Sequence, residues 1–156
     1  MIIMKMDTLY LVSFEKENKE HLEFVMELLH DESIKKRFQG IFRALNNMSD
    51  EIYDNGYLIK DGKELVGYID IGTLNEDGTI YLKEAVSSKY RGMNYGSRIL
   101  KEVTNFLFMN VDELDRIMLR IADDNISSLK TADSCGYRWL EKDYYYKDNS
   151  RERQYS

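Results

Sequence analysis

A glycine-containing turn, YRGMNYGS at residues 90–97, lies between a run of β-forming residues and the start of an amphipathic helix. The apolar residues that follow it recur at spacings of three and four, which is typical of one buried helical face. The first amides of such a helix have no intrahelical acceptor and point beyond its N-terminus. Residues 89–101 carry four basic side chains and no acidic one, although the chain has a net charge of −6. This turn therefore has the composition of an anion site, and a pyrophosphate would suit it.

A glycine in such a turn also has a purely structural use, because glycine adopts backbone conformations that other residues avoid. A second strand-then-helix sequence follows at RIMLRIADDNISSLKTADSCGYRW, where Asp124 and Asn125 precede the helix and Gly136 ends it. Two consecutive units with polar groups at the helix start favour a ligand site. Helix capping by Asp124 and Asn125 is the alternative interpretation.

The composition predicts one domain, residues 1–156, because 156 residues with 43% hydrophobic content suffice for one sizeable core. A single cysteine, Cys135, and the lack of a Cys/His cluster predict a reducing cytoplasm and no metal site. No apolar run approaches the ~18 residues of a membrane span, so we expect no membrane partner.

The charge pattern argues against a nucleic-acid partner, because such binding normally needs a broad basic face. A basic cluster does occur at Lys35, Lys36, Arg37 and Arg43, which we interpret as the solvated side of an early helix. A nucleic-acid adaptor that uses this cluster stays open as a third class of function. The two histidines, His21 and His30, lie in a charged helical run and are expected on the surface.

The elements that must position these residues follow from periodicity and turn chemistry. LYLVSF predicts a strand, and the next segment predicts a helix whose buried face includes Leu22 and Val25, followed by a shorter helix within 34–46. Two Asp-Gly turns, at Asp61-Gly62 and Asp77-Gly78, predict three antiparallel strands that end at residues 80–86.

The helix after the glycine turn makes residues 80–86 and 116–122 parallel neighbours in the sheet, because a helical crossover returns the chain in the same direction. The predicted order is β-α-α-β-β-β-α-β-α-β. We therefore expect an α+β fold with a mixed, mostly antiparallel sheet and helices on both faces.

This arrangement resembles the GNAT superfamily of acetyl-CoA-dependent N-acetyltransferases over nearly the whole chain, from about Leu9 to Tyr146. The likeness extends loosely to the ribosomal-protein N-terminal acetyltransferases. The family's cofactor loop is matched by residues 91–96, except that Asn94 stands where the family has its middle glycine. Asparagine tolerates the left-handed backbone conformation better than most residues. The resemblance implies acetyl-CoA as a co-substrate, bound by Val86, Arg91, Gly92, Met93, Asn94, Tyr95, Gly96, Ser97, Asn125 and Ser128.

A later family motif is matched by Asn125, Ser128, Gly136 and Tyr137. By resemblance, Asn125 would hydrogen-bond the pantetheine arm and Ser128 would face the sulfur end of the cofactor. Many family members protonate the departing thiolate with a tyrosine, and here that position is Ala132. Because a thiol has a pKa of about 8.5, water or Ser128 could supply the proton instead.

We expect Glu84 to act as the general base, since it lies on an apolar-flanked strand face two residues before Val86. An ion pair with a nearby Lys or Arg is the alternative role for Glu84. Asp70 is a weaker substitute, and Tyr144–Tyr146 either wall the acceptor site or fill the strand. The backbone near Val86 would stabilise the oxyanion.

The sequence thus predicts direct acetyl transfer to a primary amine of a small molecule or of a protein or peptide. An acyl-CoA-binding module of the same fold without catalysis is the alternative. The expected partners are acetyl-CoA and an acceptor amine, and the resemblance adds a homodimer.

Overall fold

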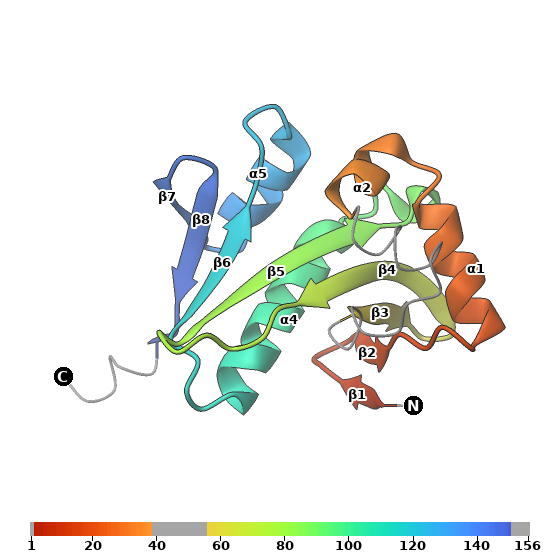
Figure 1. Cartoon of the computed structure of the whole chain (residues 1–156), viewed down its shortest axis with the longest axis horizontal. Helices are drawn as coiled ribbons and strands as arrows, with labels where there is room; N and C mark the ends of the chain where they lie inside the picture. Colours follow the sequence, from red (N-terminus) through yellow and green to blue (C-terminus); the bar gives the residue numbers. More distant parts are fainter. Residues whose placement is uncertain (1, 39–55, 151–156) are drawn as a thin grey trace. The chain divides into compact units, whose positions relative to one another are not determined.

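The computed structural model describes residues 2–38 and 56–150 (Figure 1). Its strands form one hydrogen-bonded sheet in the order β1-β2-β3-β4-β5-β6-β8-β7. The strands are β1 (Ile3–Lys5), β2 (Tyr10–Ser13), β3 (Gly56–Asp61), β4 (Glu64–Ile71), β5 (Thr79–Val86), β6 (Arg116–Arg120), β7 (Arg138–Glu141) and β8 (Tyr144–Asp148). The helices are α1 (Lys19–Leu28), α2 (Glu32–Arg37), α4 (Tyr95–Asn110), α5 (Ile126–Ser134) and the short 3₁₀ helix η1 (Ser88–Tyr90).

The sheet is mixed and mostly antiparallel, as the sequence predicts. Strands β5 and β6 run parallel, with Thr79 opposite Arg116, because α4 connects them as a crossover. The pairs β1–β2, β2–β3, β3–β4, β6–β8 and β7–β8 are antiparallel. Both Asp-Gly turns have glycine in the left-handed region, with φ of 59° at Gly62 and 81° at Gly78. The α+β fold class is therefore confirmed.

Two compact units make up the chain. The first comprises Met1–Asp70 and Glu84–Met93, and the second comprises Ile71–Lys83 and Asn94–Ser156. In the first unit, α1 and α2 contribute to a buried cluster together with the strands. Its members are Val12, Val25, Leu28, Leu29, Ile34, Phe38, Leu58, Leu65, Tyr68 and Ala85.

In the second unit, α4 buries the apolar face that the sequence predicts, and Ile99 and Val103 on it are fully buried. Polar contacts also join α4 to the end of α5 and to Tyr137, which follows α5. The Thr104 and Tyr137 hydroxyls lie 2.7 Å apart in the core, and the Cys135 thiol donates to the Ser97 carbonyl over 3.3 Å. These contacts fix α4 against the C-terminal end of α5 within this unit.

Several predicted elements need correction. Strand β1 was not expected, and the last predicted strand is a hairpin, β7 and β8, joined through Lys142 with φ of 50°. His21 is buried rather than solvated, and its Nδ1 accepts from the Glu15 amide over 3.1 Å. Desolvation lowers the pKa of His21 accordingly. Helix α2 occupies residues 32–37, and the remainder of the second predicted helix, with Arg43, falls outside the described residues.

None of the helices in the described part of the chain combines the length and the apolar character that crossing a membrane requires.

Candidate functional site

The predicted anion site lies at the start of α4, and Asn94 is the first residue there. Its backbone is left-handed, with φ of 64° and ψ of 21°, and its side chain makes no capping hydrogen bond. The N-cap side chains of α1, α2, η1 and α5 all accept a backbone amide of their own helix. The first turn of α4 is thus the exception among the described helices, because its amides receive no side-chain cap and point out of the helix end.

The turn before α4 contains a second left-handed residue, Gly92. Its φ is 79°, and a Cβ placed there would meet no heavy atom within 4 Å. The first turn of α4 contains no acidic residue. Arg98 pairs with Glu102 one turn later over 3.6 Å and lies 5.6 Å from the Tyr95 ring centroid. Geometry and charge in this stretch suit an anionic group.

The Arg91 side chain has a protein partner. Its Nη2 lies 2.6 Å from Oδ2 of Asp31, which also caps α2. Hydrogen bonds from Ser33 and Arg91 lower the pKa of Asp31 to about 2. No local sequence pattern indicates this pair, because the two residues are 60 positions apart.

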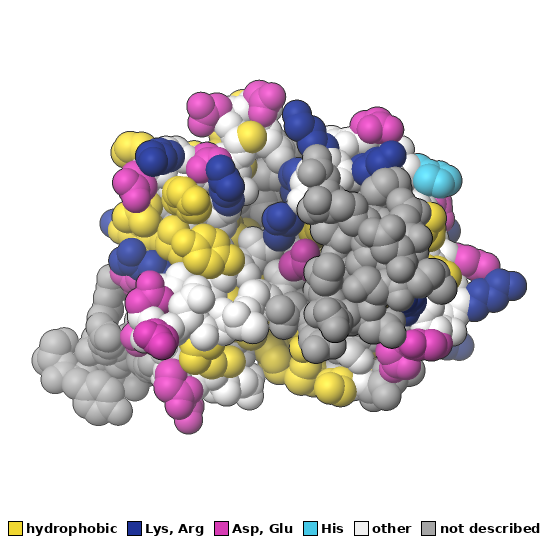
Figure 2. Space-filling model, viewed as in Figure 1, with side chains coloured by type: hydrophobic (Ala, Val, Ile, Leu, Met, Phe, Trp, Pro, Cys, Tyr) yellow, Lys and Arg dark blue, Asp and Glu magenta, His cyan; other side chains and the backbone are white. Residues whose placement is uncertain are grey.

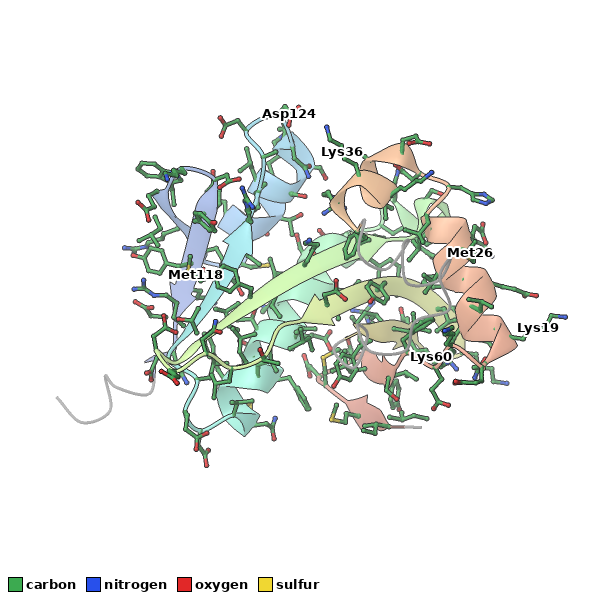
Figure 3. The ribbon with its side chains drawn as sticks, viewed as in Figure 1. Lys19, Met26, Lys36, Lys60, Met118 and Asp124 are labelled. Carbon is green, nitrogen blue, oxygen red and sulfur yellow. The ribbon has the colours of Figure 1, made fainter. Side chains whose placement is uncertain are left out.

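The start of α5 differs from that of α4. Asn125 uses its Oδ1 to accept the Ser128 amide over 3.2 Å, so the capping role foreseen as the alternative is present. The Nδ2 amide of Asn125 is the group that could donate to a ligand. Ser128 is half-buried beside it, and Asp124 lies at the tip of the preceding turn (Figure 3).

Two further positions on α5 bear on the predicted chemistry. Ala132, where the resemblance places a tyrosine in many family members, is only 1% exposed. The Ala132 methyl group is part of the core and carries no proton donor. Ser97 and Ser134 hydroxyls lie 3.1 Å apart, so the Ser97 side chain ties α4 to α5.

Glu84 lies near the end of β5 in the first unit, two residues before Val86, which ends the strand. The residue as a whole is partly exposed, but its Oε2 is buried and has no hydrogen-bond partner among the described residues. Burial raises the pKa of Glu84 to about 8, and the nearby charge of Arg37 opposes that rise. Nη1 of Arg37 donates to the Glu84 carbonyl oxygen over 3.2 Å. The pKa of Glu84 is therefore raised, and its basic neighbour Arg37 contacts the Glu84 backbone.

The weaker candidates have other contacts. Asp70 accepts the Tyr68 hydroxyl over 2.6 Å. Tyr146 packs against Arg116, whose guanidinium carbon lies 4.3 Å from the ring centroid, and Arg120 lies similarly near Tyr144. These tyrosines pack as strand side chains. Within residues 2–38 and 56–150, no group of three His, Cys, Asp or Glu residues is arranged to hold a metal ion.

Arg37 is exposed, as expected for its cluster, and its guanidinium also donates to the carbonyl oxygen of Glu84 on β5. On the face drawn in Figure 2, basic and acidic side chains are interspersed over the described residues. That mixture is unlike the broad basic face of a typical nucleic-acid-binding protein.

The predicted site residues divide between the two units. Glu84, Val86 and the first part of the turn, Arg91–Met93, belong to the first unit. The second unit holds Asn94, Tyr95, Gly96 and Ser97 at the start of α4, together with Asn125 and Ser128 on α5. In this unit the contacts of Ser97 with Ser134 and Cys135 join the start of α4 to the C-terminal end of α5, whereas Asn125 and Ser128 lie at the N-terminal end of α5.

Known structures share this fold. A GNAT-family acetyltransferase from Bacillus anthracis has a TM-score of 0.78 and 17% identity, covering 96% of this chain and 99% of that one. A Vibrio cholerae spermidine N-acetyltransferase in complex with CoA and spermine has a TM-score of 0.68, 14% identity and coverages of 92% and 96%. The Campylobacter jejuni N-acetyltransferase PseH has a TM-score of 0.67, 15% identity and coverages of 92% and 100%.

At these identities the likeness is one of fold. A search of curated protein sequences found no match. Family membership rests instead on a sequence model for the Acetyltransferase (GNAT) family, which matches residues 20–137 and so contains the turn, Glu84 and the starts of α4 and α5. The chain belongs to the GNAT family of acetyltransferases.

Proposed function

We propose that the chain is an acetyl-CoA-dependent N-acetyltransferase that moves the acetyl group directly to a primary amine of a small molecule or of a protein or peptide. The observation that carries this proposal is the start of α4, where Asn94 leaves the first-turn amides without a side-chain cap. The family model runs through both compact units. We therefore treat residues 1–156 as one N-acetyltransferase domain.

The residues that would hold acetyl-CoA are those of the turn and the two helix starts. The amides of Tyr95, Gly96 and Ser97 suit the diphosphate, with Arg91, Gly92, Met93 and Asn94 forming the approach. Asn125 would donate its amide to the pantetheine arm, and Val86 would provide backbone contacts. Acetyl-CoA supplies an activated thioester, so the protein needs no covalent intermediate of its own.

Glu84 is the proposed general base. With a pKa of about 8, it is matched to an α-amine, whose pKa is about 7.7–8.0, so that proton transfer between them costs little. A lysine-like amine near 10.4 would be harder to deprotonate. Ser128 is the proposed proton donor toward the departing sulfur, because Ala132 is buried and has no proton to give.

Cationic amines are the acceptor class that the chain's net charge of −6 favours. One neighbour in fold was solved with CoA and spermine, which makes polyamines a sensible first choice. We also propose a homodimer and a cytoplasmic location, which fits the single cysteine thiol.

The test is thiol release from acetyl-CoA in the presence of spermidine, an aminoglycoside and a peptide with a free N-terminus. The same peptide with a blocked N-terminus is the matched control. We expect release of CoA and an acetylated product, identified by mass spectrometry, with at least one free amine. Tight binding of acetyl-CoA without release for any amine would instead establish the non-catalytic acyl-CoA-binding module.

A further inference from the structure

Helix α2 carries a charged side chain at each end, and both side chains contact the segment from Glu84 to Arg91. At its start, Asp31 pairs with Arg91 over 2.6 Å. At its end, Arg37 donates to the carbonyl oxygen of Glu84 over 3.2 Å. The buried side chains of Ile34 and Phe38 anchor the helix in the core of the first unit. The six-residue helix α2 therefore contacts this segment at two residues, Glu84 and Arg91.

Arg37 contacts Glu84 through the backbone carbonyl, so it acts on the Glu84 carboxylate through its charge. Its Oε2 is buried and has no hydrogen-bond partner in the described part of the chain. A buried carboxylate is costly to ionise unless a positive charge lies nearby. Arg37 is the charged group that acts on Glu84 directly. On the neighbouring strand β4, the titratable groups Tyr68 and Asp70 are hydrogen-bonded to each other.

Asp31 acts electrostatically on Arg37. Its negative charge attracts Arg37, whereas the charge of Arg91 opposes that attraction. Asp31 is itself held firmly, since its Oδ1 accepts both the amide and the hydroxyl of Ser33, over 2.9 and 2.6 Å. The charges therefore alternate in sign along the set Arg91, Asp31, Arg37 and Glu84.

We propose that Arg37 is a positioning residue for the transfer reaction, which holds the backbone of β5 at Glu84 through the Glu84 carbonyl oxygen and places a positive charge near its buried side chain, and that Asp31 moderates the charge of Arg37. This inference rests on the proposed function only in assigning Glu84 to catalysis. The charge relationship itself belongs to the first unit and does not depend on turnover.

The test is a titration of the Glu84 carboxylate by ¹³C NMR in the full-length protein without ligand, assigned with Glu84→Gln. Arg37→Met removes the positive charge and keeps an apolar stem, so we expect the pKa of Glu84 to rise by about one unit. Asp31→Asn keeps a good N-cap but removes the negative charge, so we expect a fall of a few tenths of a unit. If α2 had only a structural role, Arg37→Met and Asp31→Asn would not shift the pKa of Glu84 in opposite directions.

Lys36→Met is the matched control, because Lys36 extends from the same helix into solvent (Figure 3). It should leave the titration unchanged, and Arg37→Lys should restore most of the wild-type value. An unchanged pKa in Arg37→Met would overturn the inference. Where turnover is observed, the acid limb of kcat/KM should shift with the NMR value. A shifted NMR value without any turnover would leave Arg37 acting on Glu84 and refute only the catalytic assignment.

Discussion

Helices α4 and α5 both begin at an asparagine that follows a strand, yet the two asparagines do different things. Asn125 has φ of −87° and caps α5 through its side chain. Asn94 has φ of 64° and makes no such bond. The backbone angle of one residue therefore decides whether the first amides of a helix are used within the protein or offered to a ligand.

The same contrast occurs between two carboxylates of the first unit. Asp31 is fully hydrogen-bonded, and its pKa is lowered to about 2. Glu84 has a buried oxygen without a partner in the described residues, and its pKa is raised to about 8. Polar groups that are hydrogen-bonded within the fold have structural roles. Those that it has left unsatisfied are the candidates for chemistry.

The largest effect on acetyl-CoA affinity is expected when a glutamate is placed at the second position of α4, compared with the same change in α5. Gly96→Glu should weaken acetyl-CoA binding by roughly 100-fold or more, because the carboxylate would repel the diphosphate at the uncapped helix end. Ser127→Glu, at the equivalent position of α5, should change the affinity only a few-fold. Isothermal titration calorimetry measures both.

Both variants should fold, because an acidic residue in the first turn stabilises a helix. Thermal melts serve as the control. Equal losses of affinity in the two variants would remove the distinction between the helix starts, and unchanged binding in Gly96→Glu would place the diphosphate elsewhere.

A second effect concerns the pH dependence of stability. Because the pKa of Glu84 is raised in the fold, the contribution of Glu84 to the free energy of unfolding should be greatest below pH 4.5 and be lost as the pH rises through about 8. Glu84→Gln removes this loss, so the variant should be more stable than wild type at pH 9 by roughly 2–4 kcal/mol and similar at pH 4.

Asp31→Asn should change the pH dependence of stability in the opposite direction. The pKa of Asp31 is lowered from 3.8 to about 2, so its contribution is present above pH 3.8 and is lost as the pH falls through 2. The variant should lose roughly 1 kcal/mol at pH 7, with little difference at pH 2. Urea denaturation across the pH range measures both variants. Parallel pH profiles would contradict the contrast between the two carboxylates.

The smallest effect is expected at the asparagines themselves. Asn125→Ala should lower the free energy of unfolding by about 1 kcal/mol through loss of the cap. Asn94→Gly should change stability by less than about 0.5 kcal/mol and tighten acetyl-CoA binding a few-fold, because glycine takes the left-handed conformation more easily. Chemical denaturation and calorimetry distinguish these results. A large loss of stability in Asn94→Gly would show that Asn94 has a structural role.

The sequence predicted the elements whose patterns are local. Apolar periodicity located α4, and the Asp-Gly turns located the hairpins around β3, β4 and β5. Strand β1 was not predicted because it has only three residues, largely exposed, which are too few to show a recognisable alternation. The β7–β8 turn was not predicted because its left-handed residue is Lys142, whereas the sequence signal for such a turn is glycine.

The candidate site was predictable as a set of residues but not as a set of contacts. Composition pointed to the turn at residues 90–97, and strand alternation pointed to Glu84. The partners of Glu84 and Arg91, namely Arg37 and Asp31, are 47 and 60 positions away in the chain. No local pattern encodes such pairs. His21 was misjudged for a similar reason, since its buried hydrogen bond depends on the fold of the preceding loop.

The central claim is that the uncapped start of α4 binds the diphosphate of acetyl-CoA, and amide NMR tests it most directly. In a ¹⁵N-labelled sample titrated with CoA, the amides of Tyr95, Gly96 and Ser97 should show the largest shifts. The amide of Ser128, which Asn125 already satisfies, should shift less. Saturable binding that leaves the amides of Tyr95–Ser97 unmoved, or no binding at all, would contradict the account.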